Sequence, residues 1–157
     1  MRFFSDQRGT SLVEFALILP ILALVLFGLL DFGKALNYWN NNTHLAAEGA
    51  RWAVVNSNPG SGQTLQQYIQ QQVDSRTDPA APPPVVCVSF PTNPATGSSG
   101  QVGDPVTVTV KRTYHWIPFV ASKIARVSTT IPGSATMRLE APPTNYSAGS
   151  GGTGTCT

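Results

Sequence analysis

The apolar positions of the chain form one long unbroken run near the N-terminus, and shorter periodic stretches follow it. Between Leu12 and Leu30 the only charged residue is Glu14. As a helix that rises about 1.5 Å per residue, this run is about 28 Å long, close to the ~30 Å hydrocarbon core of a bilayer. The pattern therefore predicts one membrane-spanning helix.

A cleavable secretory signal is the main alternative to a retained anchor, because Arg2 and Arg8 precede the apolar run. The run is longer than the roughly 7 to 15 residues usual in such a signal, and no A-x-A-like site follows it. A retained anchor is therefore favoured. Two arginines precede the span and only Lys34 follows it closely, which favours a cytoplasmic N-terminus and an exported C-terminal part.

Beyond the span, apolar and small residues recur at alternating four- and three-residue steps. This pattern predicts that the helix continues to about Val55 and presents one contact face to protein. The members of the predicted face are Phe32, Leu36, Trp39, Thr43, Ala46, Ala50 and Ala53. After turn residues at 56–62, Thr64 and Gln67 have the spacing of a capping box, so a second, short amphipathic helix is predicted to about Ser75.

The rest of the chain is predicted to be β-structure that ends in a tail rich in Gly, Ser and Thr. The expected strands are a run from Val85 to Phe90, an alternating stretch from Pro105 to Tyr114 and a stretch from Val127 to Glu140. Pro132-Gly133 should interrupt the last stretch and place it at an edge or a bulge. The expected fold class is α+β, with about three antiparallel strands packed on the long helix. A turn of helix is also expected at 121–125.

Composition narrows the possible chemistry. The chain has 157 residues, 11% charged residues and a net charge of +2, so it has no basic field that would bind nucleic acid. Lys111-Arg112 is interpreted as the solvent face of a strand. His44 and His115 do not have metal-ligand spacing, and Asp31 and Asp104 stand alone in the sequence. We therefore expect no catalytic residues, no metal and no cofactor.

Glu14 is a candidate functional residue because it lies inside the apolar run. An ionised side chain at the centre of a membrane helix costs about 2.5 to 3.5 kcal/mol, so its presence needs a reason. The alternative is that Glu14, one turn inside the run, simply extends to the headgroup region.

Several motifs together resemble those of TadE-like pseudopilins, which belong to the Tad (Flp, type IVb) pilus system. Gly9 followed by Glu14 resembles the processing site of type IV prepilins. The other segments that carry the resemblance are Ala46-Ala47-Glu48-Gly49-Ala50-Arg51, Gly103-Asp104-Pro105-Val106-Thr107-Val108-Thr109-Val110 and Ser134-Ala135-Thr136-Met137-Arg138-Leu139-Glu140. The major pilins of that system carry Glu-Tyr where this chain has Glu14-Phe15, which favours a minor pseudopilin.

The resemblance implies a protein that acts by assembly in the inner membrane or in an extracellular pilus. A prepilin peptidase would cut between Gly9 and Thr10, and Glu14-Phe15 would guide the subunit into the Tad assembly machinery beside other pilins. The Glu14 carboxylate would then face the free amine of Thr10 on an adjacent subunit. The implied organisation is a leader at 1–9, a transmembrane segment at 10–30, an exported head at 31–140 and a tail at 141–157.

Two other classes of protein fit parts of the sequence. A membrane-anchored adhesion or carbohydrate-binding module would use the helix only as an anchor, and a small exported enzyme is a third possibility. In an exported domain, the two cysteines, Cys87 and Cys156, are expected to form a disulfide. The alternative is that one or both stay unpaired at a frayed chain end.

Overall fold

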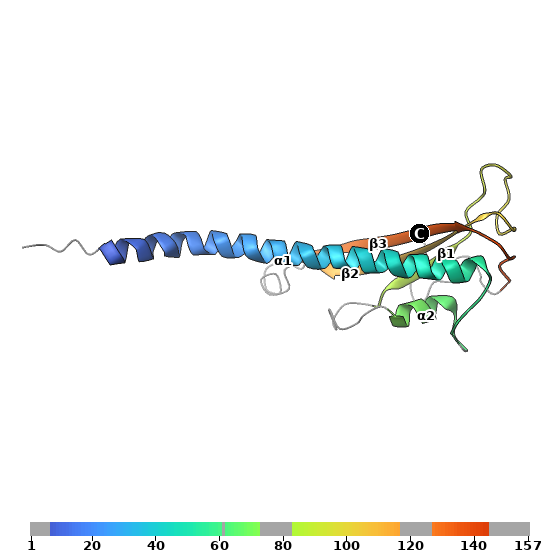
Figure 1. Cartoon of the computed structure of the whole chain (residues 1–157), viewed down its shortest axis with the longest axis horizontal. Helices are drawn as coiled ribbons and strands as arrows, with labels where there is room; N and C mark the ends of the chain where they lie inside the picture. The colour runs from blue at the N-terminus through green and yellow to red at the C-terminus, as the bar shows by residue number, and fades with distance from the viewer. Residues whose placement is uncertain (1–6, 61, 73–82, 117–126, 145–157) are drawn as a thin grey trace, which may run out of the picture.

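The computed structural model describes residues 7–60, 62–72, 83–116 and 127–144. Its elements in chain order are helix α1 (Gln7–Val54), helix α2 (Leu65–Gln72) and strands β1 (Val85–Ser89), β2 (Pro105–His115) and β3 (Ser128–Arg138). Figure 1 shows an elongated molecule in which the first half of α1 extends alone, while the strands and α2 lie along its second half. This arrangement confirms the predicted α+β fold class.

The first half of α1 is an apolar rod that packs on none of the other helices and strands in the described part of the chain. The helix has 48 residues, so it is about 70 Å long. Its apolar stretch is long enough to cross a membrane by length and composition, and none of that stretch is buried within the chain. Leu17 and Leu24, for example, are 70% and 73% exposed. The length and exposure of this half agree with the span predicted from the sequence.

The second half of α1 covers one face of an antiparallel sheet. Within the described residues the strand order is β1-β2-β3, and consecutive strands pair. Val106, Val108 and Val110 of β2 are completely buried, as their alternation predicted. They pack with Ala46, Ala50 and Ala53 of α1, Leu65 and Ile69 of α2, and Val86 and Val88 of β1. Small side chains on α1 therefore let the helix lie close to the sheet.

The first three members of the predicted contact face of α1 do not face the sheet. Phe32, Leu36 and Trp39 are 54%, 46% and 56% exposed. The residues that face the sheet are each one position earlier: Asp31, Ala35 and Tyr38. Both sets have the same four- and three-residue steps, so periodicity alone could not distinguish them. The buried set is selected by contacts with strand residues such as Tyr114, which lies 83 residues after Asp31 in the sequence.

Strand β3 lies at the edge of the sheet, as Pro132 predicted, but the expected interruption at Pro132-Gly133 is wrong. The strand is continuous, with Pro132 paired to Lys111 and Gly133 to Val110 of β2, and Gly133 lies against the backbone of α1. A Cβ atom built on Gly133 would clash with backbone atoms of Asn42 and Thr43 and would lie 2.7 Å from Asn42 O. The Asn42 side chain also donates a hydrogen bond from Nδ2 to Ile131 O at 2.9 Å. Helix α1 thus covers part of an edge strand that would otherwise expose unpaired backbone groups.

Helix α2 begins with the predicted capping box. The Thr64 N–H donates to Gln67 Oε1 at 3.0 Å, and the Gln67 N–H donates to Thr64 Oγ1 at 3.2 Å. These two bonds satisfy backbone donors that the first turn leaves without helical partners. Leu65 and Ile69 turn inward to the core. The predicted last turn of this helix at 73–75 and the helical turn at 121–125 lie outside the described residues.

Candidate functional site

The four residues of the predicted processing and assembly site lie at the start of α1. Gly9, Thr10, Glu14 and Phe15 belong to the same continuous helix, and Thr10, Glu14 and Phe15 are exposed. Thr10 and Glu14 are four residues apart, so they lie on one side of the helix, about 6 Å apart along its axis. A neighbouring chain that reaches the Glu14 carboxylate would therefore also meet Thr10.

A buried polar and aromatic cluster joins the end of the apolar half of α1 to the end of β2. Asp31 is the first residue after the apolar run and is only 7% exposed. The Tyr114 hydroxyl, at the end of β2, donates to the Asp31 side chain and lies 3.1 Å from Asp31 O. Burial, together with the hydrogen bond to Asp31 and the negative charge of that residue, raises the pKa of Tyr114 above its ordinary value. Tyr114 therefore remains a neutral donor, and Asp31, expected to stand alone, joins α1 to β2.

Arg112 belongs to the same cluster, which corrects its prediction as a solvent-facing residue. Its side chain is 4% exposed, and its Cζ lies 4.2 Å from the centroid of the Tyr38 ring. Tyr38 in turn meets Tyr114 edge to face, with centroids 5.1 Å apart. An arginine can occupy the core-facing side of β2 because the face of an aromatic ring attracts a cation. Only Lys111 of the pair lies on the opposite face of β2.

Asp104 organises the loop that precedes β2. Its side chain is 1% exposed and accepts hydrogen bonds from Asn93 Nδ2 at 3.0 Å, Ser98 Oγ at 2.9 Å and the Gln101 N–H at 3.0 Å. Burial disfavours the charged carboxylate, but the hydrogen bonds outweigh burial and lower the pKa of Asp104 below its ordinary value. Hydrophobic periodicity does not predict this role of Asp104, because its hydrogen-bond donors belong to an irregular loop. The short Asn, Thr and Ser side chains before Asp104 were the available signal.

We expect Asp104→Asn to destabilise the head at neutral pH and to reduce its loss of stability in acid. Because the folded pKa of Asp104 is lowered, its ionised form stabilises the fold above about pH 4, and this contribution disappears as pH falls through the folded pKa. The midpoint of urea unfolding of the detergent-solubilised full chain, measured at neutral pH and at about pH 3, checks this. An equal acid-induced change in both proteins would contradict it.

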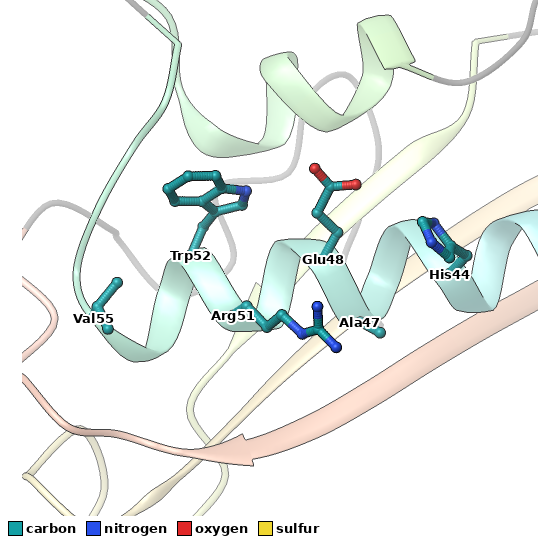
Figure 2. A pocket seen from close by; sticks show the side chains of 6 residues that line it. All are labelled: His44, Ala47, Glu48, Arg51, Trp52 and Val55. Carbon is teal, nitrogen blue, oxygen red and sulfur yellow. The ribbon is translucent and has the colours of Figure 1, made fainter.

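An open groove of about 400 Å³ lies along the second half of α1. Its lining residues are His44, Ala47, Glu48, Arg51, Trp52 and Val55. Figure 2 shows Glu48 and Trp52 pointing toward α2, with Arg51 and Ala47 on an adjacent side of the helix. The described residues contain no group of three or more His, Cys, Asp or Glu side chains that could hold a metal ion. The groove offers a mixed-charge surface beside an indole ring.

Cys87 lies in the middle of β1 and is 5% exposed. Its predicted partner, Cys156, lies outside the described residues, as does the rest of the tail from 145 onward. The Cys87–Cys156 disulfide therefore stays a prediction.

Residues 9–51 match a family model described as TadE-like protein. The matched segment begins at Gly9 and ends at Arg51, so it covers most of α1, including Glu14, the apolar half and the Glu-Gly-Ala-Arg segment. The match confirms that this segment resembles TadE-like proteins. The long apolar N-terminal helix fits a membrane-anchored pilin. No curated protein and no solved structure matches the chain significantly.

Proposed function

We propose that this chain is a minor pilin, or pseudopilin, that takes part in the assembly of a Tad (Flp, type IVb) pilus after a prepilin peptidase removes residues 1–9. The observation that carries the proposal is the division of one TadE-like helix into two halves. Its first half is apolar and unburied, and its second half packs in the core of a small α+β head. Such a chain acts by assembly with other pilins and with the Tad machinery.

In this proposal the chain crosses the inner membrane once. Residues 10–30 span the bilayer, the N-terminus is cytoplasmic, and the head at 31–140 is exported. Support comes from Asp31, which follows the apolar run directly and is already held by Tyr114 of the head. The head therefore begins where the span ends, without an intervening linker.

Glu14 and Thr10 have complementary roles in the proposed assembly step. Cleavage after Gly9 would create a new amine at Thr10, and the Glu14 carboxylate of an adjacent subunit would pair with it. An ion pair removes the cost of an isolated charge in an apolar environment, and it also fixes the register of the two helices. The position of Thr10 and Glu14 on one side of α1 lets each subunit offer both groups to its neighbours.

Processing is the first test of this proposal. We expect intact-mass analysis of membrane-extracted protein, expressed in a host with its own prepilin peptidase, to show loss of residues 1–9. The chain should also appear in sheared pili or in the membrane fraction that holds the assembly machinery. A mature chain that still begins at Met1 in that host would refute the pilin proposal.

A disulfide between Cys87 and Cys156 is a second expected property of the exported head. It would close a loop of about 70 residues, which in the chain-entropy model stabilises the fold by about 4 kcal/mol. Alkylation of the native exported protein, followed by mass analysis with and without reductant, measures the two thiols. Two alkylated cysteines without reductant would contradict the pairing.

A further inference from the structure

The end of β2 and the start of β3 lie where the apolar half of α1 stops. His115 pairs with Ser128, and the Trp116 N–H donates to Val127 O at 3.0 Å. We call these four residues the sheet base. The sheet base lies at the opposite end of β2 from the loop that Asp104 organises.

Contacts between β2 and α1 set the level of the sheet base along the helix. Val108 lies against Gly49, in the second half of α1. Farther along β2, the Tyr114 hydroxyl reaches Asp31 and lies 3.1 Å from its backbone oxygen. The strand therefore runs toward the apolar half of α1 as it ends. Trp116 follows two residues later, about 7 Å farther in that direction, so the sheet base lies beside the end of the apolar run.

The side chains of the sheet base suit the boundary between lipid and water. The Trp116 ring meets Tyr114 edge to face with centroids 5.2 Å apart, and its indole N–H donates to Thr129 Oγ1 at 2.8 Å. Trp116 is partly exposed, and Val127 beside it is 56% exposed. Tryptophan prefers the membrane interface because its ring is apolar while its N–H needs a polar partner. The exposed valine adds apolar surface to the same end of the sheet.

The charges at this level do not oppose contact with lipid. Among the described residues, Asp31 carries the only carboxylate near the sheet base, and it is buried against Tyr114. Lys34, one turn farther along α1, is exposed. The sequence between Trp116 and Val127 contains no acidic residue. Lipid phosphates would therefore meet a positive charge and no exposed carboxylate of the described chain at this level.

We propose that the sheet base is a second membrane contact of this chain. The Trp116 indole lies in the interfacial layer of the bilayer, and Val127 lies at the edge of the hydrocarbon. The inference rests on the membrane anchoring in the proposed function and goes beyond it, because the sheet holds the head to the bilayer as well as α1. A helix alone leaves the head free to rotate about the helix axis, whereas a second contact on another element limits that rotation and fixes which side of the head faces the lipid.

Fluorescence quenching in liposomes tests this contact on the purified full chain. Trp39→Phe with Trp52→Phe leaves Trp116 as the only tryptophan. We expect its emission to fall at least about twofold when the phosphatidylcholine carries bromine near the headgroup end of its acyl chains. The matched control, Trp39→Phe with Trp116→Phe, keeps only Trp52, which lies about 30 Å beyond Asp31 along α1 and should not be quenched. An unquenched Trp116 would overturn the proposal.

A second comparison changes the sheet base without moving the fluorophore. Val127→Glu, in the chain with Trp116 alone, places a negative charge at the lipid boundary and should remove about half or more of the quenching. Val102→Glu makes the same change at a 62% exposed valine in the loop before β2 and should leave the quenching unchanged. Circular dichroism checks that both variants are folded. Equal quenching in the two variants would overturn contact through the sheet base.

Phe27→Trp, in a chain whose three native tryptophans are replaced by Phe, reports on the anchor itself. Phe27 is 56% exposed in the apolar half of α1, so the new indole should be quenched by the same lipid. A quenched Phe27→Trp with an unquenched Trp116 would overturn this inference and retain the anchor. If neither were quenched, the membrane anchoring in the proposed function would fail as well. The liposomes contain no other protein, so quenching of Trp116 reports lipid and not a pilus component.

Discussion

Glu14→Val is expected to enter the membrane and to be cleaved after Gly9, yet to support almost no pili. Removal of a charge from the apolar run favours insertion, so synthesis and anchoring should be normal. Assembly should fail because the Thr10 amine of the adjacent subunit loses its partner and remains an uncompensated charge between helices. Pilus counts should fall by a hundredfold or more, on the order of the effect of breaking a desolvated ion pair.

Two further substitutions at Glu14 distinguish the effect of its negative charge from the effect of its side-chain length. Glu14→Asp keeps the carboxylate on a shorter side chain, so pilus counts should lie between those of the wild type and Glu14→Val. Glu14→Gln keeps the length without the charge and should resemble Glu14→Val. Each variant must be the only copy in its strain, and cleavage and pili are scored in the same cells. Normal pili from Glu14→Val would make Glu14 a tolerated surface charge and would favour a simple membrane anchor.

Gly133→Ala is expected to destabilise the head by about 3 kcal/mol, the upper end of the usual cost of overpacking. The new methyl group would meet backbone atoms of Asn42 and Thr43, which belong to the middle of α1 and cannot move aside separately. Separation of β3 from α1 would also lengthen the hydrogen bond from Asn42 to Ile131 O. Urea unfolding of the detergent-solubilised full chain, followed by near-ultraviolet circular dichroism, measures the loss.

Gly49→Ala is the matched control, because it adds the same methyl group at another buried glycine. There the nearest atoms belong to the side chains of Ile69 and Val108, the latter at 3.1 Å, and side-chain ends can rotate away. Alanine also favours the helix by up to about 1 kcal/mol over glycine, which offsets part of the crowding. We expect a loss of about 1 kcal/mol or less. Equal losses at the two positions would show that contact with the helix backbone is not what makes Gly133 special.

Local patterns in the sequence predicted most of the secondary structure. The alternation of Val106, Val108 and Val110 placed β2 and its buried face correctly, because a strand has only two faces and one was apolar. Thr64 and Gln67 marked the start of α2, since a capping box is made entirely from neighbouring residues. The end of α1, predicted at about Val55, lies at Val54.

The wrong predictions concern features that depend on distant residues. The exposure of Phe32 and Trp39 depends on which side of α1 meets the sheet, and that side is set by contacts to Asp31 and Tyr38 from β2. The burial of Arg112 depends on the Tyr38 ring across the interface. For the candidate site, the motif from Gly9 to Glu14 was readable because it lies within one helical segment, whereas the Asp31 cluster joins residues 83 positions apart.

The parallel course of β3 and α1 has a mechanical consequence for the head. Figure 1 shows the strand beside the second half of the helix along much of its length, and Gly133 fixes the closest approach of the two. A pull along α1 therefore loads these contacts in shear, so that they resist together, whereas a pull across the helix would open them one after another. We expect the head to withstand a pull along α1 better than its small core suggests, because survival under force depends on the rate of unfolding.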